Sequence, residues 1–300
     1  MHSQQLTDAA QPPSDVRRLV HIGNGRGNRE MLRLMSPSDL GEHLKPFVFL
    51  DLFAADMRLM QQSMSMHPHS GIATVTVITE GDMVYDDPQS GRGTLEYGGV
   101  EWLRAGGGVW HGKELAAGES RLTRGFQLWL ALPPELENGT VDSQYIGARD
   151  MPRVGPATVI LGRHASAVSP VRAPEGITYL QVRLSPGEQW AFTPEDGQSV
   201  GWFAVAEGEV DAGGRVSAGQ IAFFEDGAGP MSFRAHSTSG ATFVLGAAIP
   251  HDHPLYLGYY SVHTTAEALA AGERRIAELG ARLMASGDRR TASGNVPVFR

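Results

Sequence analysis

The chain carries one strand-turn-strand pattern twice. Residues 77–81 read VITEG and are followed by Asp82, while residues 205–208 read VAEG and are followed by Glu209. The two copies are offset by about 127 residues, and a further apolar run follows each of them. The length of 300 residues also exceeds the usual size of one compact domain. We therefore expect two similar β domains in tandem.

Short apolar or alternating runs, separated by turn residues, fill both halves of the chain. The 37 Gly and 18 Pro supply many turns, which favours strands over a helix bundle. Serial antiparallel strands of this length close into jelly-roll barrels, so the expected fold class is all-β. We place one barrel at residues 18–135 and a second at 153–250. The expected strands include 72–79, 100–104 and 126–132 in the first barrel, and 179–184, 200–206, 221–224 and 242–248 in the second.

Only the C-terminal end has a helical pattern, within residues 262–286. Thr264 and Glu267 have the spacing of a capping box. Four apolar side chains share one face of the helix: Leu269, Ile276, Leu279 and Leu283. Gly272 and Gly280 each disfavour the helix by about 1 kcal/mol relative to alanine. We therefore expect docking on a barrel to hold this helix in place.

Charge and composition restrict the possible partners. With 33 acidic and 25 basic side chains, the formal charge is −8, and direct binding of nucleic acid is not expected. The chain has no cysteine, so metal binding or catalysis must use His, Asp, Glu, Ser, Lys or Tyr side chains. Residues 1–18 lack the apolar core of a secretory signal, and no apolar run approaches the roughly 20 residues that span a membrane. We therefore expect a cytoplasmic protein without a membrane partner.

A histidine pair precedes one of the expected strands. In an extended segment, His67 and His69 project from the same face, so both imidazoles can reach one point inside the barrel. A third histidine, His111, follows a run of three glycines and could be brought beside the pair. Three imidazoles suit a divalent transition metal with an open position, although solvated loop histidines are the alternative. The repeat places Pro194 and Asp196 at the positions equivalent to the pair, so the barrel itself does not require imidazoles there.

Three segments together resemble the central motifs of the pirin family. They read HPHSGIATVTVITEG, RGTLEYGGVEWLRAGGGVWH and GFQLWLALP, and the resemblance continues to the helix after YYSVHTT. It implies a bicupin, which consists of two tandem cupin barrels with a C-terminal helix packed on them. It also implies a site in the N-terminal barrel, where three histidines and a glutamate bind Fe(II) or a similar divalent ion.

The resemblance matches three of the four implied ligands. His67, His69 and His111 stand at the histidine positions, but Lys113 stands where the family has its glutamate. An ammonium group is repelled by a divalent cation, so Lys113 is a poor ligand. Glu114, the next residue, can serve as metal ligand and catalytic base if the loop bulges by one residue. Otherwise it faces solvent.

Other positions depart from the family or have ordinary explanations. Ser70 and Ala73 stand where the family commonly has arginine and glutamate, which changes the surroundings of the pocket. The second histidine pair, His251 and His253, lies between prolines and is expected in a surface loop. Three tryptophans on or beside strands of the first barrel are expected in the core, although one at its mouth could stack on a flat substrate. They are Trp102, Trp110 and Trp129.

The resemblance implies several functions. One is a quercetin 2,3-dioxygenase-type oxidoreductase, in which the metal binds a small aromatic substrate such as a flavonol and Glu114 accepts its hydroxyl proton. Another is a regulatory pirin that acts through a protein partner. A third is a degenerate cupin in which Lys113 is a fixed cation for an anionic ligand. Three imidazoles accept several transition metals, so Fe(II) is expected from the family alone.

Overall fold

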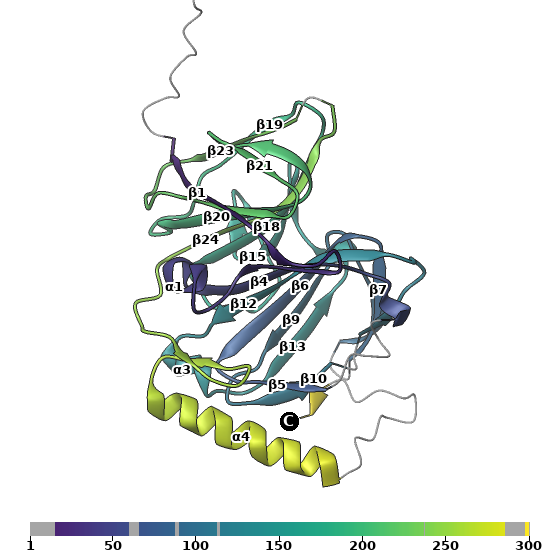
Figure 1. The fold of residues 1–300 in the computed structure, drawn as a ribbon, viewed down its shortest axis with the longest axis vertical. Coiled ribbons are helices and arrows are strands. Elements are labelled where there is room, and N and C mark those ends of the chain that lie inside the picture. The colour runs from purple at the N-terminus through teal and green to yellow at the C-terminus, as the bar shows by residue number, and fades with distance from the viewer. Residues whose placement is uncertain are drawn as a thin grey trace, which may run out of the picture.

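The computed structural model describes residues 16–59, 66–87, 90–112, 115–236, 238–285 and 298–299. Figure 1 shows two β units, one above the other, with one long helix beneath the lower unit. The lower unit contains the N-terminal half of the chain, and the upper unit contains the C-terminal half. The all-β fold with a C-terminal helix is as expected.

The two main sheets have the same strand order. Every pairing along them is antiparallel, and the third strand in each order carries one copy of the repeated pattern. The first sheet runs β13 (Asp142–Ile146), β9 (Val100–Arg104), β6 (Ile72–Glu80), β12 (Thr123–Ala131), β4 (Phe47–Ala55), β3 (Met31–Met35) and β2 (Arg26–Gly27). The second runs β1 (Leu19–Asn24), β22 (Gln220–Phe224), β20 (Val200–Asp211), β24 (Ala241–Ala248), β18 (Ile177–Leu184), β15 (Ala157–Leu161) and β14 (Arg153–Val154).

The repeat preserves one backbone constraint. Gly81 and Gly208 both adopt positive φ, at 76° and 75°. A Cβ atom at Gly81 would lie 2.3 Å from the carbonyl oxygen of Leu122, and one at Gly208 would lie 2.1 Å from that of Gly240. Glycine is therefore required at both turns for conformation and for space.

Strand β1 lies on the sheet of the other half of the chain. Leu19–Asn24 pair with β22, although the sequence placed these residues in the first barrel. Arg17, just before β1, donates from its backbone N to the carbonyl oxygen of Pro230 at 2.9 Å. The first sheet is completed instead by β13, which lies beyond the expected end of that barrel at residue 135. The N-terminal strand thus crosses to the second sheet, and the first barrel extends to Ile146.

The two main sheets pack against each other through their apolar outer faces. Alternate residues of β6, β9 and β12 enter a shared core that also contains residues of β18, β20 and β24. Trp102 from the first sheet and Trp202 from the second are both fully buried there. Phe47 meets Trp202 edge to face, with ring centroids 5.3 Å apart. One layer of each barrel is therefore a wall between the two units.

Small sheets and short helices close the ends of the units. The N-terminal unit has β5 (His67–His69), β10 (Val109–His111) and β27 (Val298–Phe299), and also β7 (Asp82–Asp87), β8 (Gly91–Glu96) and β11 (Leu115–Ala117). In the C-terminal unit, β19 (Gln189–Phe192), β21 (Arg215–Ser217) and β23 (Met231–Ala235) branch from the second main sheet, and β16 (Arg163–His164) and β17 (Ala167–Val168) form a small sheet of their own. The remaining elements are β25 (Tyr256–Leu257), β26 (Val262–His263), α1 (Leu40–Leu44), α3 (Pro134–Glu137) and the 3₁₀ turn η1 (Ala148–Asp150).

Helix α4 (Ala266–Ala285) lies under the N-terminal unit, beside β5 and β10 (Figure 1). Trp110 donates from its indole N–H to the carbonyl oxygen of Ile276 at 2.8 Å. The expected capping box is wrong, because the Thr265 hydroxyl accepts from the backbone N of Ala268 while that of Thr264 is bound to Glu137. No helix in the described part of the chain is both long and apolar enough to cross a membrane.

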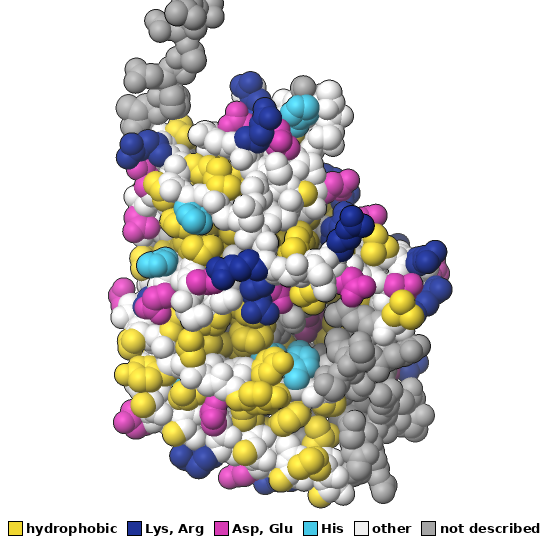
Figure 2. All heavy atoms as spheres, in the orientation of Figure 1, with side chains coloured by type: hydrophobic (Ala, Val, Ile, Leu, Met, Phe, Trp, Pro, Cys, Tyr) yellow, Lys and Arg dark blue, Asp and Glu magenta, His cyan; other side chains and the backbone are white. Residues whose placement is uncertain are grey.

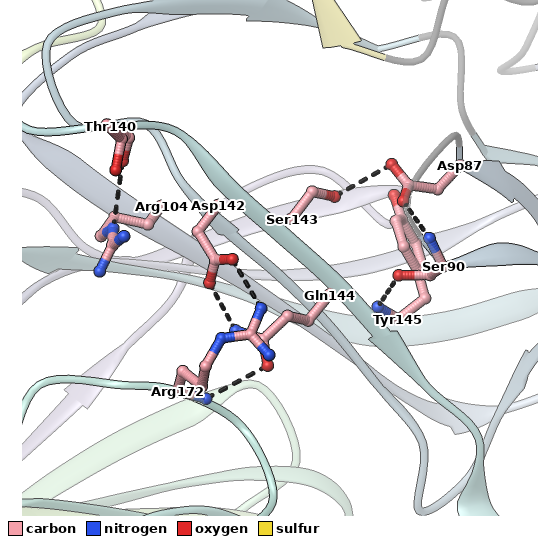
Figure 3. A network of polar contacts seen from close by, with 9 residues as sticks. All are labelled: Asp87, Ser90, Arg104, Thr140, Asp142, Ser143, Gln144, Tyr145 and Arg172. Carbon is pink, nitrogen blue, oxygen red and sulfur yellow. Dashed lines mark hydrogen bonds and ion pairs between the residues drawn. The ribbon is translucent and has the colours of Figure 1, made fainter.

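Polar contacts of β13 join the two units along one side (Figure 3). Arg172, from the C-terminal unit, binds the carboxylate of Asp142 at 2.7 Å, and its backbone N donates to the side-chain oxygen of Gln144. On the opposite face of the strand, the Ser143 hydroxyl binds Asp87 at 3.1 Å. These contacts fix the outer edge of the first sheet to its neighbours on both sides.

Candidate metal centre

The three predicted histidines lie together in the N-terminal barrel. Strands β5 and β10 pair so that His67 stands opposite His111 and His69 stands opposite Val109. One ring nitrogen from each histidine lies within 4.8 Å of the others. His69 is fully buried, His111 is 3% exposed, and His67 is half-buried. Two neighbouring strands therefore present three imidazoles to one point.

The surroundings of His69 favour the form that binds a metal. Its Nδ1 lies 3.1 Å from the carbonyl oxygen of Tyr260, and a carbonyl can only accept a hydrogen bond, so the proton is on Nδ1. Its Nε2 is buried and has no hydrogen-bond partner among the described residues. Burial lowers the pKa of His69 well below its usual value, and the neighbouring His111 and His67 lower it further. The imidazole is thus neutral, with an inward lone pair on Nε2.

Aromatic side chains form one wall beside the histidines. Trp129 meets His69 edge to face, with ring centroids 4.9 Å apart, and stacks on Phe49 at 4.1 Å. Tyr260 lies 5.8 Å from both His67 and His69, measured between ring centroids. Figure 2 shows hydrophobic side chains over this barrel, gathered around a histidine that reaches the surface. This wall suits a flat ligand.

A belt of polar side chains crosses the inner face of the first sheet. Neighbouring residues on these strands, including Leu128 and Trp102, enter the core between the sheets, so the belt residues point into the barrel. Gln127, at the middle of the belt, is partly exposed, so the belt reaches solvent. In order of cross-strand pairing, the belt consists of Arg33, Asp51, Gln127, Thr76, Glu101 and Tyr145.

The belt includes two buried carboxylates, Asp51 and Glu101. Asp51 is held by the guanidinium of Arg33 through a two-pronged ion pair, with one N–O distance of 3.1 Å. Burial nevertheless raises the pKa of Asp51, because desolvation outweighs the attraction of Arg33. Glu101 is 1% exposed and lies on β9. The first sheet thus supplies buried hydrogen-bond acceptors on its inner face.

The second barrel has no comparable belt in its described residues. Its interior is an apolar cluster dominated by five phenylalanines: Phe192, Phe203, Phe224, Phe233 and Phe243. Pro194 and Asp196, which the repeat aligns with His67 and His69, lie in the loop after β19. The same architecture therefore encloses a polar site in one copy and a filled core in the other.

The remaining sequence expectations have different outcomes. Glu114 and Lys113 lie outside the described residues, so the proposed fourth ligand stays a prediction. His251 and His253 lie in a loop beside Lys45, and the described residues contain no other His, Asp, Glu or Cys group arranged like the first. Of the tryptophans, Trp102 is in the inter-sheet core, Trp110 supports α4, and Trp129 lines the site.

Sequence reasoning missed the Tyr260 carbonyl and the polar belt. The belt had a usable signal, because single polar residues such as Asp51 and Gln127 interrupt strands that are otherwise apolar. In-register polar residues of this kind indicate a lined interior. The contact of Tyr260 had no such signal, because a backbone atom 191 residues away carries it.

Known proteins resemble this chain along most of its length. The sequence model described as Pirin matches residues 28–130. A Pseudomonas aeruginosa protein named as a candidate quercetin 2,3-dioxygenase is 30% identical over 255 residues, covering 79% of this chain and 87% of its own. Pirin-1 of Arabidopsis thaliana is 28% identical over 225 residues, covering 71% of this chain and 75% of its own.

Solved structures share the fold. Quercetin 2,3-dioxygenase from Acinetobacter baumannii superposes with a TM-score of 0.72 at 22% identity, covering 86% of this chain and 96% of its own. The Escherichia coli pirin YhhW, solved in complex with nickel(II), has a TM-score of 0.58 at 18% identity, covering 78% and 98%. The architecture of this chain is therefore that of a bicupin, and the chain belongs to the pirin family.

Proposed function

We propose that this pirin is a metal-dependent oxidoreductase of the quercetin 2,3-dioxygenase type, acting on a flavonol or a similar small aromatic. The observation that carries the proposal is the set of three imidazoles within 4.8 Å of one another, with the lone pair of His69 directed inward. The names of the Pseudomonas relative and the Acinetobacter structure support the reaction class.

The donor set fits a divalent transition metal. His67, His69 and His111 would hold it, and three neutral nitrogens leave coordination positions open. We propose Fe(II), and the nickel(II) complex of the Escherichia coli pirin supports metal binding in this family. When bound, such an ion would polarise a coordinated substrate oxygen and engage dioxygen.

The side chains around the histidines would bind and orient the substrate. Trp129 and Tyr260 would contact its ring faces, since both line the histidine cluster. The belt would receive its hydroxyl groups, because Asp51 and Glu101 are hydrogen-bond acceptors. The apolar residues above and below the belt would exclude water from the reacting atoms.

A carboxylate must accept the hydroxyl proton of the substrate. We propose Glu114 for this role, as the first carboxylate after His111 in the chain. Glu101 is the second candidate, because it is buried on the inner face of the barrel. Asp51 is less suitable as the base, because its carboxylate is already paired with the guanidinium of Arg33.

The test begins with metal content and oxygen uptake of the untagged chain. We expect near-stoichiometric iron after anaerobic reconstitution with Fe(II), and oxygen uptake on adding quercetin. His69→Ala should abolish both, while His251→Ala, in the loop pair, should change neither. Glu114→Gln and Glu101→Gln should separate the two candidate bases, because only loss of the true base reduces turnover while metal stays bound.

Two outcomes would contradict the proposal. A native chain that takes up no metal under these conditions would remove the site. A metal-loaded chain that consumes no oxygen with flavonols would remove the dioxygenase activity and favour a regulatory or ligand-binding pirin.

A further inference from the structure

A segment from the C-terminal end of the second barrel crosses to the metal centre. Residues 259–264, which we name the strap, run beside β5, where Ser261 forms a parallel bridge with Ser70. The backbone N of Val262 donates to the carbonyl oxygen of Ser70 at 3.2 Å. Within the strap, Tyr260 adopts a left-handed conformation, with φ of 56°, and its carbonyl oxygen contacts Nδ1 of His69. The strap thus supplies the atom that sets the tautomer of one proposed ligand.

A chain of buried polar side chains holds the strap. Ser70 Oγ lies 2.8 Å from Ser261 Oγ and 3.0 Å from Nε2 of His263. On the other side of the His263 ring, Nδ1 lies 3.3 Å from a carboxylate oxygen of Glu137, in a contact that lacks the alignment of a hydrogen bond. Glu137 also accepts from the backbone N and the hydroxyl of Thr264, at 2.6 and 2.7 Å. We name Ser70, His263 and Glu137 the relay.

The relay has the residue types of a hydrolase triad, but its position excludes nucleophilic catalysis. Ser70, His263 and Glu137 are 0%, 1% and 3% exposed. Helix α4 covers them at Gly272, where a Cβ atom would lie 2.5 Å from Nε2 of His263 and 2.6 Å from Oγ of Ser70. No substrate can reach the hydroxyl while α4 is docked. A structural role therefore fits this geometry better.

We propose that the relay positions the Tyr260 carbonyl oxygen at Nδ1 of His69. Metal binding and the docking of the strap and α4 would then stabilise each other. This inference rests on the proposed metal site. The Ser70 hydroxyl is its centre, since Ser70 follows His69 in the sequence and its hydroxyl contacts Ser261 and His263 of the strap. The Ser261 hydroxyl extends the chain by donating to the Tyr259 carbonyl at 3.0 Å.

The physical basis is the tautomer of His69. With the Tyr260 carbonyl in place, the proton stays on Nδ1 and the lone pair on Nε2 faces the other two histidines. If the strap shifts, that acceptor is lost and the ring can rotate or move its proton to Nε2, which blocks coordination. Removal of hydrogen-bond partners of metal ligands lowers metal affinity by about 10-fold to 100-fold in general. Because coupling is reciprocal, a bound metal should also protect the strap from opening.

The test compares Ser70→Ala and Glu137→Gln with Ser169→Ala. Ser169 is also buried and makes a hydrogen bond to a backbone carbonyl, at 2.7 Å, but it lies in the C-terminal unit. Three readouts are needed: the dissociation constant for Ni(II), the ¹⁵N shifts of the histidine rings in the metal-free chain, and hydrogen exchange of residues 259–285 with and without Ni(II). Gly272→Ala adds a variant that places a methyl group of α4 against Ser70 and His263 without removing a polar group.

We expect the relay variants to weaken Ni(II) binding by about 10-fold or more, with loss of the single Nδ1–H tautomer of His69 and faster exchange in the strap. Ser169→Ala should match the native chain. Folded relay variants with native tautomer and native Ni(II) affinity would overturn the inference. If the native chain itself binds no metal, the proposed function fails separately, and the relay is then judged by the ¹⁵N shifts and exchange of the metal-free variants.

Discussion

Two adjacent arginines, Arg17 and Arg18, allow a direct test of how β1 is held on the second sheet. Arg17 is 4% exposed and donates to the carbonyl oxygens of Glu225 and Ser199, at 2.8 and 2.6 Å. Arg18 is 80% exposed and forms an ion pair with the carboxylate of Glu225. The pair therefore differs in burial while both members attach the same end of β1 to the second barrel.

Truncation of Arg17 removes two charge-assisted hydrogen bonds. Each is worth roughly 1.5–3 kcal/mol when made by a charged group. Burial lowers the pKa of the Arg17 guanidinium, although the nearby Asp226 and Glu225 act to raise it. The cost of desolvating the guanidinium therefore offsets part of the hydrogen-bond energy. We expect Arg17→Ala to lower the free energy of unfolding by about 2–4 kcal/mol. Arg18→Ala should have little effect, because solvent screens its ion pair.

Urea unfolding of the full chain, followed by tryptophan fluorescence, measures both variants. The second barrel contains Trp190 and Trp202, so its transition is visible. We expect a lower midpoint for Arg17→Ala with an unchanged slope, as for a loss of stability without a change in exposed surface. Equal midpoints for the two variants would refute the reasoning, because the buried guanidinium would then not hold the N-terminal strand on the second sheet.

Three further predictions concern pH, the repeated turn and the aromatic wall. The metal-free chain should lose stability as the pH falls below about 6.5. In the folded chain, burial lowers the pKa of His69 and His263 below the ordinary histidine value of 6.5, so unfolding at low pH takes up protons. The urea midpoint should therefore be lower at pH 5 than at pH 8, and equal midpoints would contradict this. Gly81→Ala should lower the melting temperature more than Gly91→Ala, since both glycines have φ of 76° but only the first meets a backbone oxygen. Trp129→Leu should raise the KM for quercetin more than it lowers the Ni(II) affinity, because Trp129 offers no metal-binding atom and meets His69 by an edge-to-face ring contact. Equal effects would indicate a role in metal binding alone.

The local pattern predicted the strands well, because each depends on residues near in sequence. The expected strand 100–104 coincides with β9, and 72–79 is extended by one residue in β6. The terminal helix was also predicted, but its cap was displaced by one residue. The Thr264 hydroxyl donates to Glu137, a buried partner 127 residues away, so Thr265 caps the helix instead. Local propensity could not reveal that competition.

The gathering of the histidines was predictable for a similar reason. Alternation along an extended segment places His67 and His69 on one face, and β10 then brings His111 opposite His67. The carbonyl of Tyr260 and the relay from Ser70 to Glu137 could not be predicted. They join residues that only the closed barrel and the docked helix bring together.

The sequence by itself determined that this protein has two similar β units, a terminal helix and a histidine cluster in only one unit. Those features follow from periodicity and residue type, which act locally. Only the tertiary structure decided that β1 and β13 complete the sheets, that one barrel is lined with polar groups and the other filled, and that a distant strap orients His69. Each of these depends on contacts between segments far apart in the chain, where burial and hydrogen bonding in the folded state select the partner.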